Sequence, residues 1–139
     1  MEIYLAQSET DLLRCFPVVM QLRPHLSQTQ FVDQVLQQQQ EGFHLAYLQD
    51  QDAVKAIAGY RYMNTLAHGQ ILYVDDLVTD ANSRSQGYGQ QLIAWLFEQA
   101  RTQDCRSLQL DSGVQRTDAH RFYFREGLVI NSFRFAKSI

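Results

Sequence analysis

The chain has 139 residues, of which 45% are hydrophobic and 19% are charged, and its formal net charge is −3. This length supports one compact core, so we expect a single domain over residues 1–139. The small negative charge argues against the electrostatic attraction that nucleic-acid-binding proteins use. No apolar run reaches the length of a membrane span, and the first residues lack the regions of a signal peptide. We therefore expect a cytoplasmic protein with a small partner, and neither nucleic acid nor membrane.

Possible metal ligands are scattered along the sequence. Cys15 and Cys105 form no CxxC pair, and the four histidines are far apart. Zinc sites need cysteines and histidines at short, regular spacing. We therefore expect no metal.

The first half of the chain carries both helical and strand patterns. Its periodicity predicts strands over residues 2–6, 43–48, 53–63 and 71–79 and helices over residues 10–22 and 27–40. The polar residues 49–52 are typical of a hairpin turn, so the strands beside them should pair antiparallel. The fourth strand is apolar apart from Asp75 and Asp76, which is expected of a central strand covered on both faces.

The second half predicts a strand, loop, helix and strand in direct succession. Its periodicity predicts helices over residues 87–103 and 117–126 and strands over residues 107–111 and 128–136. A helix between two strands favours parallel pairing of residues 71–79 with residues 107–111. Gly127 is expected to end the last helix as its C-terminal cap.

The loop between the fourth strand and the following helix has the composition of an anion site. It reads Arg84-Ser85-Gln86-Gly87-Tyr88-Gly89. Glycines let backbone N–H groups approach a ligand closely, and a helix start offers unpaired donors and a partial positive charge. A phosphate group would fit these donors. The alternative is a tight turn without a ligand.

Two known phosphate-binding patterns fit this loop poorly. The P-loop requires a lysine followed by Ser or Thr after its last glycine, and Gln90 and Gln91 stand there instead. A dinucleotide fingerprint starting at Gly87 would place Leu92 at its third glycine. Such a fingerprint should also follow the first strand of a parallel sheet, whereas strands predicted to pair antiparallel precede this loop. One feature agrees with the fingerprint: Asp111 lies about twenty residues further on, where a ribose-binding acid is expected.

The order of elements and two motifs resemble the GNAT superfamily of acyl-CoA-dependent N-acetyltransferases. The loop RSQGYG is similar to the family's pyrophosphate loop, R-x-x-G-x-G or A. Residues 119–128 resemble the second family signature, A-x-x-F-Y-x-x-x-G-F, with Leu128 in place of the usual Phe. The resemblance covers about residues 71–128.

The resemblance implies an α/β fold and the place of a cofactor. The implied fold is a mixed, mainly antiparallel sheet, flanked by helices, whose central parallel strands splay apart. The cofactor would be acetyl-CoA, with its pantetheine arm against Leu77, Val78 and Thr79 and its pyrophosphate over the residues Arg84, Ser85, Gln86, Gly87, Tyr88 and Gly89. Backbone amides near Leu77 and Val78 would then polarise the thioester carbonyl, which is oxyanion stabilisation.

An amine with a lysine-like pKa arrives protonated, so a base is needed before it attacks a thioester. Asp75 and Asp76 are the candidates, because they interrupt an apolar strand next to the expected thioester position. Successive strand residues face opposite sides, so only one should face the cleft unless a bulge intervenes. We prefer Asp76. The alternative is that either acid caps a loop amide or pairs with an arginine.

Two further residues are candidates in the C-terminal part. Tyr123 has the position that, by the resemblance, donates a proton to the departing CoA thiolate, and the alternative is a core aromatic between Phe122 and Phe124. Asp111 follows the second parallel strand and could bind a cationic substrate. The alternative is that residues 111–113 form only a turn.

These features predict an N-acetyltransferase that moves an acetyl group from acetyl-CoA to a primary amine by direct attack. The acids at Asp75, Asp76 and Asp111 favour a cationic acceptor, either a small molecule or a peptide. The alternative functions are a CoA-binding sensor without turnover and a structural protein with neither cofactor nor catalysis. The oligomeric state stays open, with a homodimer as one alternative.

Overall fold

The computed structural model describes all residues from Met1 to Ile139. The chain divides into two compact units, Met1–Gln109 and Leu110–Ile139. The first unit contains most of one sheet and three helices, and the second contains one helix and the C-terminal segment.

Five strands form one sheet in the order β1-β2-β3-β4-β5. Their bounds are β1 Glu2–Leu5, β2 Phe43–Asp50, β3 Ala53–Thr65, β4 Gly69–Thr79 and β5 Ser107–Leu110. The first four strands pair antiparallel with their neighbours, and β5 pairs parallel with β4. The predicted fold class, a mixed and mainly antiparallel sheet flanked by helices, is therefore confirmed.

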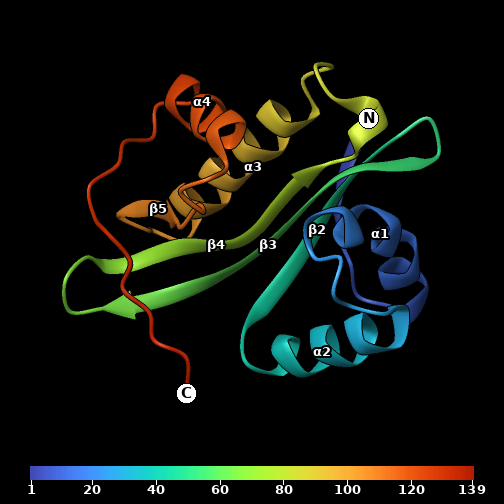
Figure 1. Ribbon diagram of the computed structural model, residues 1–139, viewed down its shortest axis with the longest axis horizontal. Helices are drawn as coiled ribbons and strands as arrows, with labels where there is room; N and C mark the ends of the chain where they lie inside the picture. Colours follow the sequence, from blue (N-terminus) through green and yellow to red (C-terminus); the bar gives the residue numbers. More distant parts are fainter. The chain divides into compact units, whose positions relative to one another are not determined.

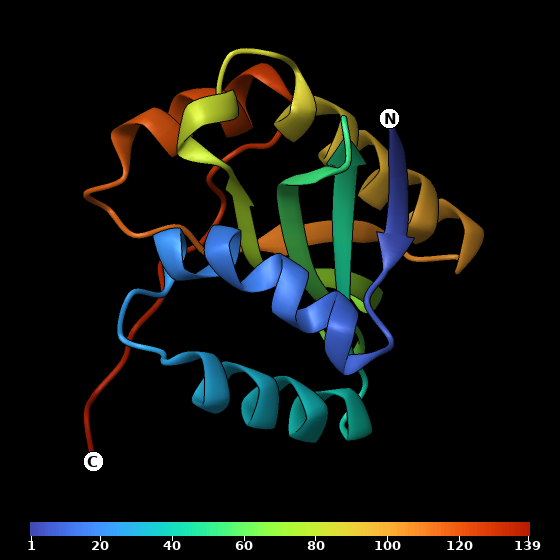
Figure 2. The same cartoon turned by 90° about the vertical axis from the view of Figure 1, so that its right-hand side faces the viewer.

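Helices cover both faces of the sheet in the first unit (Figure 1). One face packs against α1 (Glu9–Leu22) and α2 (Gln28–Gln40), which lie side by side in both views (Figure 2). The side chains buried between them include Leu12, Phe31 and Ile57. The other face packs against α3 (Tyr88–Thr102), whose Leu92 and Leu96 are fully buried. The apolar stripe predicted for this helix is therefore its buried face.

The helices α1 and α2 both begin with a complete capping box. Ser8 accepts a hydrogen bond from the N–H of Asp11, whose carboxylate accepts from the N–H of Ser8 in return. Ser27 and Gln30 form the same reciprocal pair at the start of α2. Such boxes satisfy N–H groups that have no partner inside the helix.

The second unit contains α4 (Thr117–Arg125). Gly127 ends this helix with φ +89°, and the N–H of Leu128 donates to the carbonyl of Tyr123 at 3.0 Å. This is the glycine-terminated helix end that the sequence predicts. The predicted strand over residues 128–136 is wrong, because these residues form no regular secondary structure. Their apolar pattern suits a strand, but a strand exists only where its backbone pairs with a neighbour.

None of the helices is both long enough and apolar enough to cross a bilayer. The longest of them, α3, has 15 residues and a polar face, whereas a membrane-spanning helix needs about 20 mostly apolar residues.

Candidate active site

The start of α3 carries backbone donors without a side-chain partner. The loop from Arg84 to Gly89 follows a 3-10 turn, η1 (Ala81–Ser83), and Gly87 is the N-cap of α3 with φ +83°. No side chain caps this helix, in contrast to α1 and α2. None of the ion pairs in the chain involves Arg84, which is exposed beside the loop. Open N–H groups next to a guanidinium suit a diphosphate.

Side chains from other elements hold both ends of this loop. On the side of η1, Gln21 of α1 donates to the carboxylate of Asp80 and accepts from the N–H of Ala81, both at 2.8 Å. On the side of α3, the hydroxyl of Tyr88 donates to Asp50 of β2 at 2.7 Å, which raises the pKa of Tyr88. The loop is therefore positioned before any ligand arrives.

The strands β4 and β5 run together over only part of their length. The N–H of Arg106, just before β5, donates to the carbonyl of Gln70 near the start of β4 at 2.8 Å. Because β5 has four residues and β4 has eleven, β5 runs alongside the first half of β4 only. Leu77, Val78 and Thr79 pair with β3 on one side and have no strand neighbour on the other. This divergence agrees with the expected splay.

A β-bulge brings both strand acids to one face of the sheet. In the pairing of β3 with β4, Gly59 is opposite Asp76 and Tyr60 is opposite Val74, so Asp75 is an extra residue. Both carboxylates contact residues on the α1 side of the sheet. Without a bulge, two successive residues would point to opposite faces. From the sequence, we expected both acids on one face only if a bulge intervened, and the structure contains this bulge.

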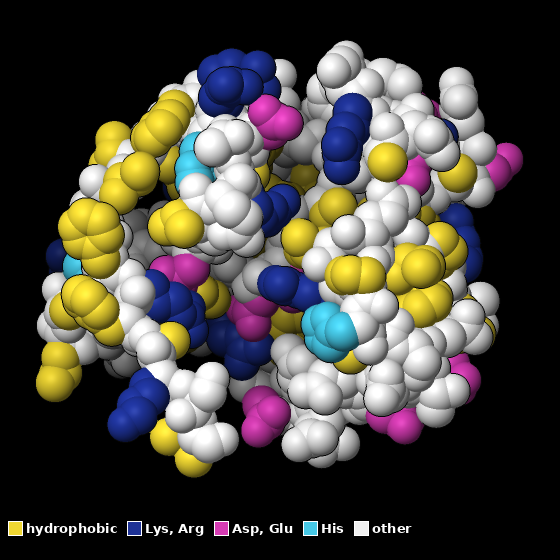
Figure 3. Space-filling view, in the orientation of Figure 1, with side chains coloured by type: hydrophobic (Ala, Val, Ile, Leu, Met, Phe, Trp, Pro, Cys, Tyr) yellow, Lys and Arg dark blue, Asp and Glu magenta, His cyan; other side chains and the backbone are white.

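Each of these acids pairs with an arginine. Figure 3 shows basic and acidic side chains lying against one another near the middle of the face drawn. Arg61 of β3 binds Asp75 with two parallel hydrogen bonds, 3.1 Å from Nε and 2.7 Å from Nη2. Arg23, the C-cap of α1, donates from Nε to Oδ1 of Asp76 at 2.9 Å, and its Nη2 lies 2.8 Å from the same oxygen in the ion pair. Burial raises the pKa of Asp76, and the charge of Arg23 opposes this rise. The pairing alternative considered from the sequence thus holds for both acids, and the raised pKa shows that burial outweighs the arginine at Asp76.

Gly59 leaves the space in which Asp76 and Phe43 sit. A Cβ atom at position 59 would lie 2.7 Å from Oδ2 of Asp76 and 2.5 Å from Cζ of Phe43. The Phe43 ring in turn lies under the guanidinium of Arg61, 5.4 Å from its centroid. The cluster of Arg23, Arg61, Asp75 and Asp76, called the acid–arginine cluster below, is therefore packed against an aromatic ring.

The second unit contains the other two candidates. Burial raises the pKa of Tyr123, and its ring packs edge-on against Phe122 at 5.6 Å between centroids. Asp111 accepts a hydrogen bond from Arg134 at 2.6 Å and so already has a cationic partner. The roles of both residues stay predictions.

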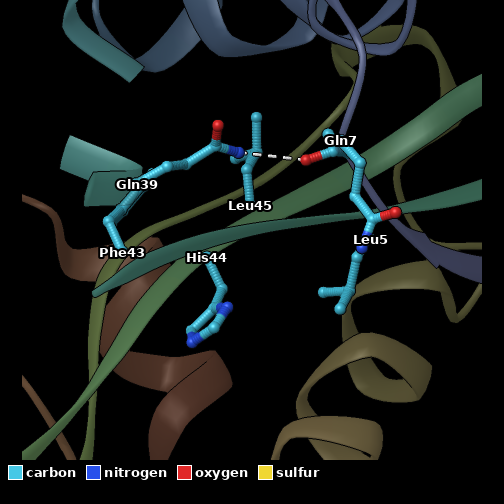
Figure 4. Close-up of a pocket in the computed structure, with 7 residues that line it drawn as sticks. Leu5, Gln7, Gln39, Phe43, His44 and Leu45 are labelled. Atoms are coloured by element: carbon cyan, nitrogen blue, oxygen red, sulfur yellow. Dashed lines mark hydrogen bonds between the residues drawn. The ribbon is translucent and has the colours of Figure 1, made fainter. Parts of the chain in front are cut away.

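A pocket of about 230 Å³ lies elsewhere in the first unit, between the end of β1, the end of α2 and the start of β2 (Figure 4). Gln39 closes one side by donating to the carbonyl of Ala6 at 3.0 Å. His44 points away from Leu45, and burial lowers its pKa. None of the predicted site residues lines this pocket. We assign it no chemistry.

Sequence reasoning missed the partners that hold the acids. Arg23 falls between the helices predicted over residues 10–22 and 27–40 and was assigned no role, and Arg61 and Gly59 were not singled out. A signal existed for Gly59, because glycine inside a strand often marks a bulge or a close approach. A signal existed for the arginines as well, since two acids in an apolar strand need partners.

Comparison with known proteins shows the class to which this fold belongs. A family model described as the acetyltransferase (GNAT) family matches residues 7–127. An aminoglycoside N-acetyltransferase whose structure was solved in complex with CoA superposes with a TM-score of 0.83, at 14% identity, over 99% of this chain and 95% of that one. The shared fold is that of an acetyltransferase.

Two curated relatives sharpen this result. The chain is 33% identical over 138 residues to the uncharacterized N-acetyltransferase YhdJ of Bacillus subtilis strain 168, covering 95% of this chain and 94% of that protein. It is 41% identical over 66 residues to the aminoalkylphosphonate N-acetyltransferase of Salmonella typhimurium strain LT2, covering 48% and 43%. The chain belongs to the GNAT family, whose activity is acetyl transfer.

Proposed function

We propose that this protein transfers an acetyl group from acetyl-CoA to a primary amine that reaches the site as an ammonium ion. The observation that carries the proposal is the uncapped start of α3 directly after a strand that diverges from its parallel neighbour. The proposal includes the single domain and cytoplasmic location expected from the sequence, without metal, membrane or nucleic acid.

This arrangement supports the cofactor residues that the resemblance implies. Arg84, Ser85, Gln86, Gly87, Tyr88 and Gly89 would hold the diphosphate, and Leu77, Val78 and Thr79 would line the pantetheine arm. Acetyl-CoA supplies, when bound, an acetyl group activated as a thioester. Because the N–H of Asp80 donates to the carbonyl of Lys55 in β3, the N–H of Val78 also faces β3, and the N–H of Leu77 faces the side of β4 that has no β5 neighbour. The backbone amide of Leu77 could therefore donate to the carbonyl oxygen.

The proton transfers are assigned to two residues. Asp76 takes a proton from the ammonium nitrogen, because its partly buried carboxylate has a raised pKa and therefore a greater affinity for a proton. The neutral nitrogen then attacks the carbonyl carbon, the C–N bond forms, the C–S bond breaks, and the nitrogen releases a second proton to water as it becomes an amide. Tyr123 donates a proton to the departing sulfur. Asp75, with both oxygens bound by Arg61, supports the bulge and is the weaker candidate for the base.

The relative from Salmonella favours a small amine as acceptor. Its name gives an aminoalkylphosphonate as the compound it acetylates, and the match with this chain is partial. A small molecule is therefore preferred over a peptide. Asp111, which is already paired with Arg134, would have to exchange that partner to bind a cationic acceptor.

Two measurements on the intact protein test the proposal. Acetyl-CoA at 100 times its Kd should add about 2.7 kcal/mol to the free energy of unfolding and raise Tm. A panel of small amines should then release free thiol from acetyl-CoA, with release depending on the amine. A rise in Tm without amine-dependent release would support the CoA sensor instead. No rise in Tm would contradict both.

A further inference from the structure

We propose that the acceptor amine also carries an acid group, a carboxylate or a phosphonate, which Arg23 and Arg61 bind while Asp76 faces the amine. This inference rests on the proposed function and names its substrate class. It depends on the hydrogen bonds that the acid–arginine cluster uses and on those it leaves open.

Both arginines leave the same nitrogen available. Arg61 uses Nε and Nη2 on Asp75, whereas Arg23 donates from Nε to Asp76 and from Nη2 to the carbonyl of Asp75 at 3.1 Å. The Nη1 amino group of each guanidinium therefore keeps two N–H donors for a ligand. The side chains of Arg23 and Arg61 are 41% and 27% exposed, so a ligand can reach them.

The charges of the cluster favour a zwitterion over a simple cation. Two carboxylates face two guanidiniums, and every carboxylate already has a cationic partner. A polyamine would meet two positive charges here and would have to compete with arginines for the acids. An amine with an acid group satisfies both sides, because the acid accepts from Nη1 and the ammonium lies beside Asp76.

The cluster is also built to hold its groups in place. Asp75 and Asp76 are adjacent on a bulge, the Phe43 ring packs under Arg61, and Gly59 admits Asp76. Because the arginines bind neighbouring residues, an acceptor that contacts both an arginine and Asp76 needs only a short chain between its amine and its acid. A rigid charge arrangement selects such a substrate at a low entropic cost.

Matched pairs of acceptors test this inference. The pairs are β-alanine with β-alaninamide and 2-aminoethylphosphonate with ethanolamine, assayed by acetyl-CoA-dependent thiol release. We expect kcat/KM about 10- to 100-fold higher for the acid-bearing member of at least one pair, the range for charge-assisted hydrogen bonds. A preference in the first pair indicates that the site binds a carboxylate, and a preference in the second indicates that it binds a phosphonate.

Variants assign the preference to the arginines. Arg61→Lys and Arg23→Lys keep the charge but remove Nη1, and both should reduce the preference while the neutral acceptors lose less. Arg101→Gln removes an exposed arginine on α3 that pairs only with Glu98, so it should keep the wild-type preference. Equal use of acid-bearing and neutral amines would overturn this inference and leave the proposed function intact. Failure of every amine, with CoA bound, would overturn both.

Discussion

The start of α3 and the bulge of β4 satisfy their polar groups in opposite ways. At the start of α3 the backbone donors have no side-chain cap and Arg84 has no ion pair. At the bulge each carboxylate already has a guanidinium. Unpaired donors bind an anion strongly and with little selectivity between anions. Charges that are already paired accept only a ligand that matches the hydrogen-bonding groups still available. The first region suits a common cofactor, and the second suits a chosen acceptor.

Replacing the acids of the bulge should have the largest effect. Asp76→Asn keeps the size of the side chain and removes its basicity, so kcat/KM should fall by about 10²- to 10⁴-fold. The base must be ionised, so wild-type kcat/KM should rise with pH through the raised pKa of Asp76. The variant should lose this dependence, and its deficit should be largest above the pKa of Asp76 and below that of the amine, where the wild type has an ionised base but free amine is scarce.

Asp75→Asn is the matched control for this experiment, since it removes the neighbouring carboxylate, whose oxygens both bind Arg61. It should cost less activity than Asp76→Asn at every pH. Wild-type kcat/KM in both variants would mean that water or the free amine accounts for the proton.

Tyr123, which belongs to neither region, is the residue proposed to donate a proton to the departing sulfur. Tyr123→Phe removes the hydroxyl and keeps the ring, so packing against Phe122 should survive. Turnover should fall by up to about 10²- to 10⁴-fold while the Kd for acetyl-CoA stays the same. Unchanged turnover, with the chemical step limiting the rate, would make Tyr123 a core aromatic.

Changing the backbone at the start of α3 should abolish the open anion site. Gly87→Val places a β-branched residue at φ +83°, which costs about 1–3 kcal/mol of strain and displaces the donors. The rise in Tm with acetyl-CoA should be lost. Gly42→Val makes the same change at φ +94°, where a Cβ meets no atom within 4 Å. This control should lower stability and keep the response to acetyl-CoA.

Filling the space at the bulge should disturb the acceptor region alone. Gly59→Ala brings a methyl group within 2.7 Å of Asp76 and 2.5 Å of Phe43. Overpacking of this kind costs about 1–3 kcal/mol of stability. The KM for the amine should rise, and the Kd for acetyl-CoA should stay the same. Unchanged stability would show that Phe43 and Asp76 move aside freely.

The two regions also differ in how well the sequence predicts them. The loop at α3 is local, so its residues, its glycine and its helix could be read from a short stretch of sequence. The acid–arginine cluster depends on pairing between β3, β4 and the end of α1, and no spacing in the sequence contains that register. The strand expected over residues 128–136 failed for a related reason, because its alternation says nothing about a partner strand.

The capped helices provide the smallest test of the comparison. Ser8→Ala and Ser27→Ala each remove a cap and should lower the free energy of unfolding by about 1 kcal/mol without changing the response to acetyl-CoA.

The two variants should differ in the pH dependence of this loss, measured by urea unfolding at neutral and acid pH. Hydrogen bonds from the N–H of Gln7 and from Ser8 lower the pKa of Asp11, whereas the residue at the same position of α2, Gln30, does not titrate. The carboxylate's contribution is present above its ordinary pKa and lost as the pH falls through the lowered value. Ser8→Ala should therefore cost less in acid, and Ser27→Ala should cost the same; an equal cost at both pH values would mean that Ser8 stabilises the N–H of Asp11 and not its charge.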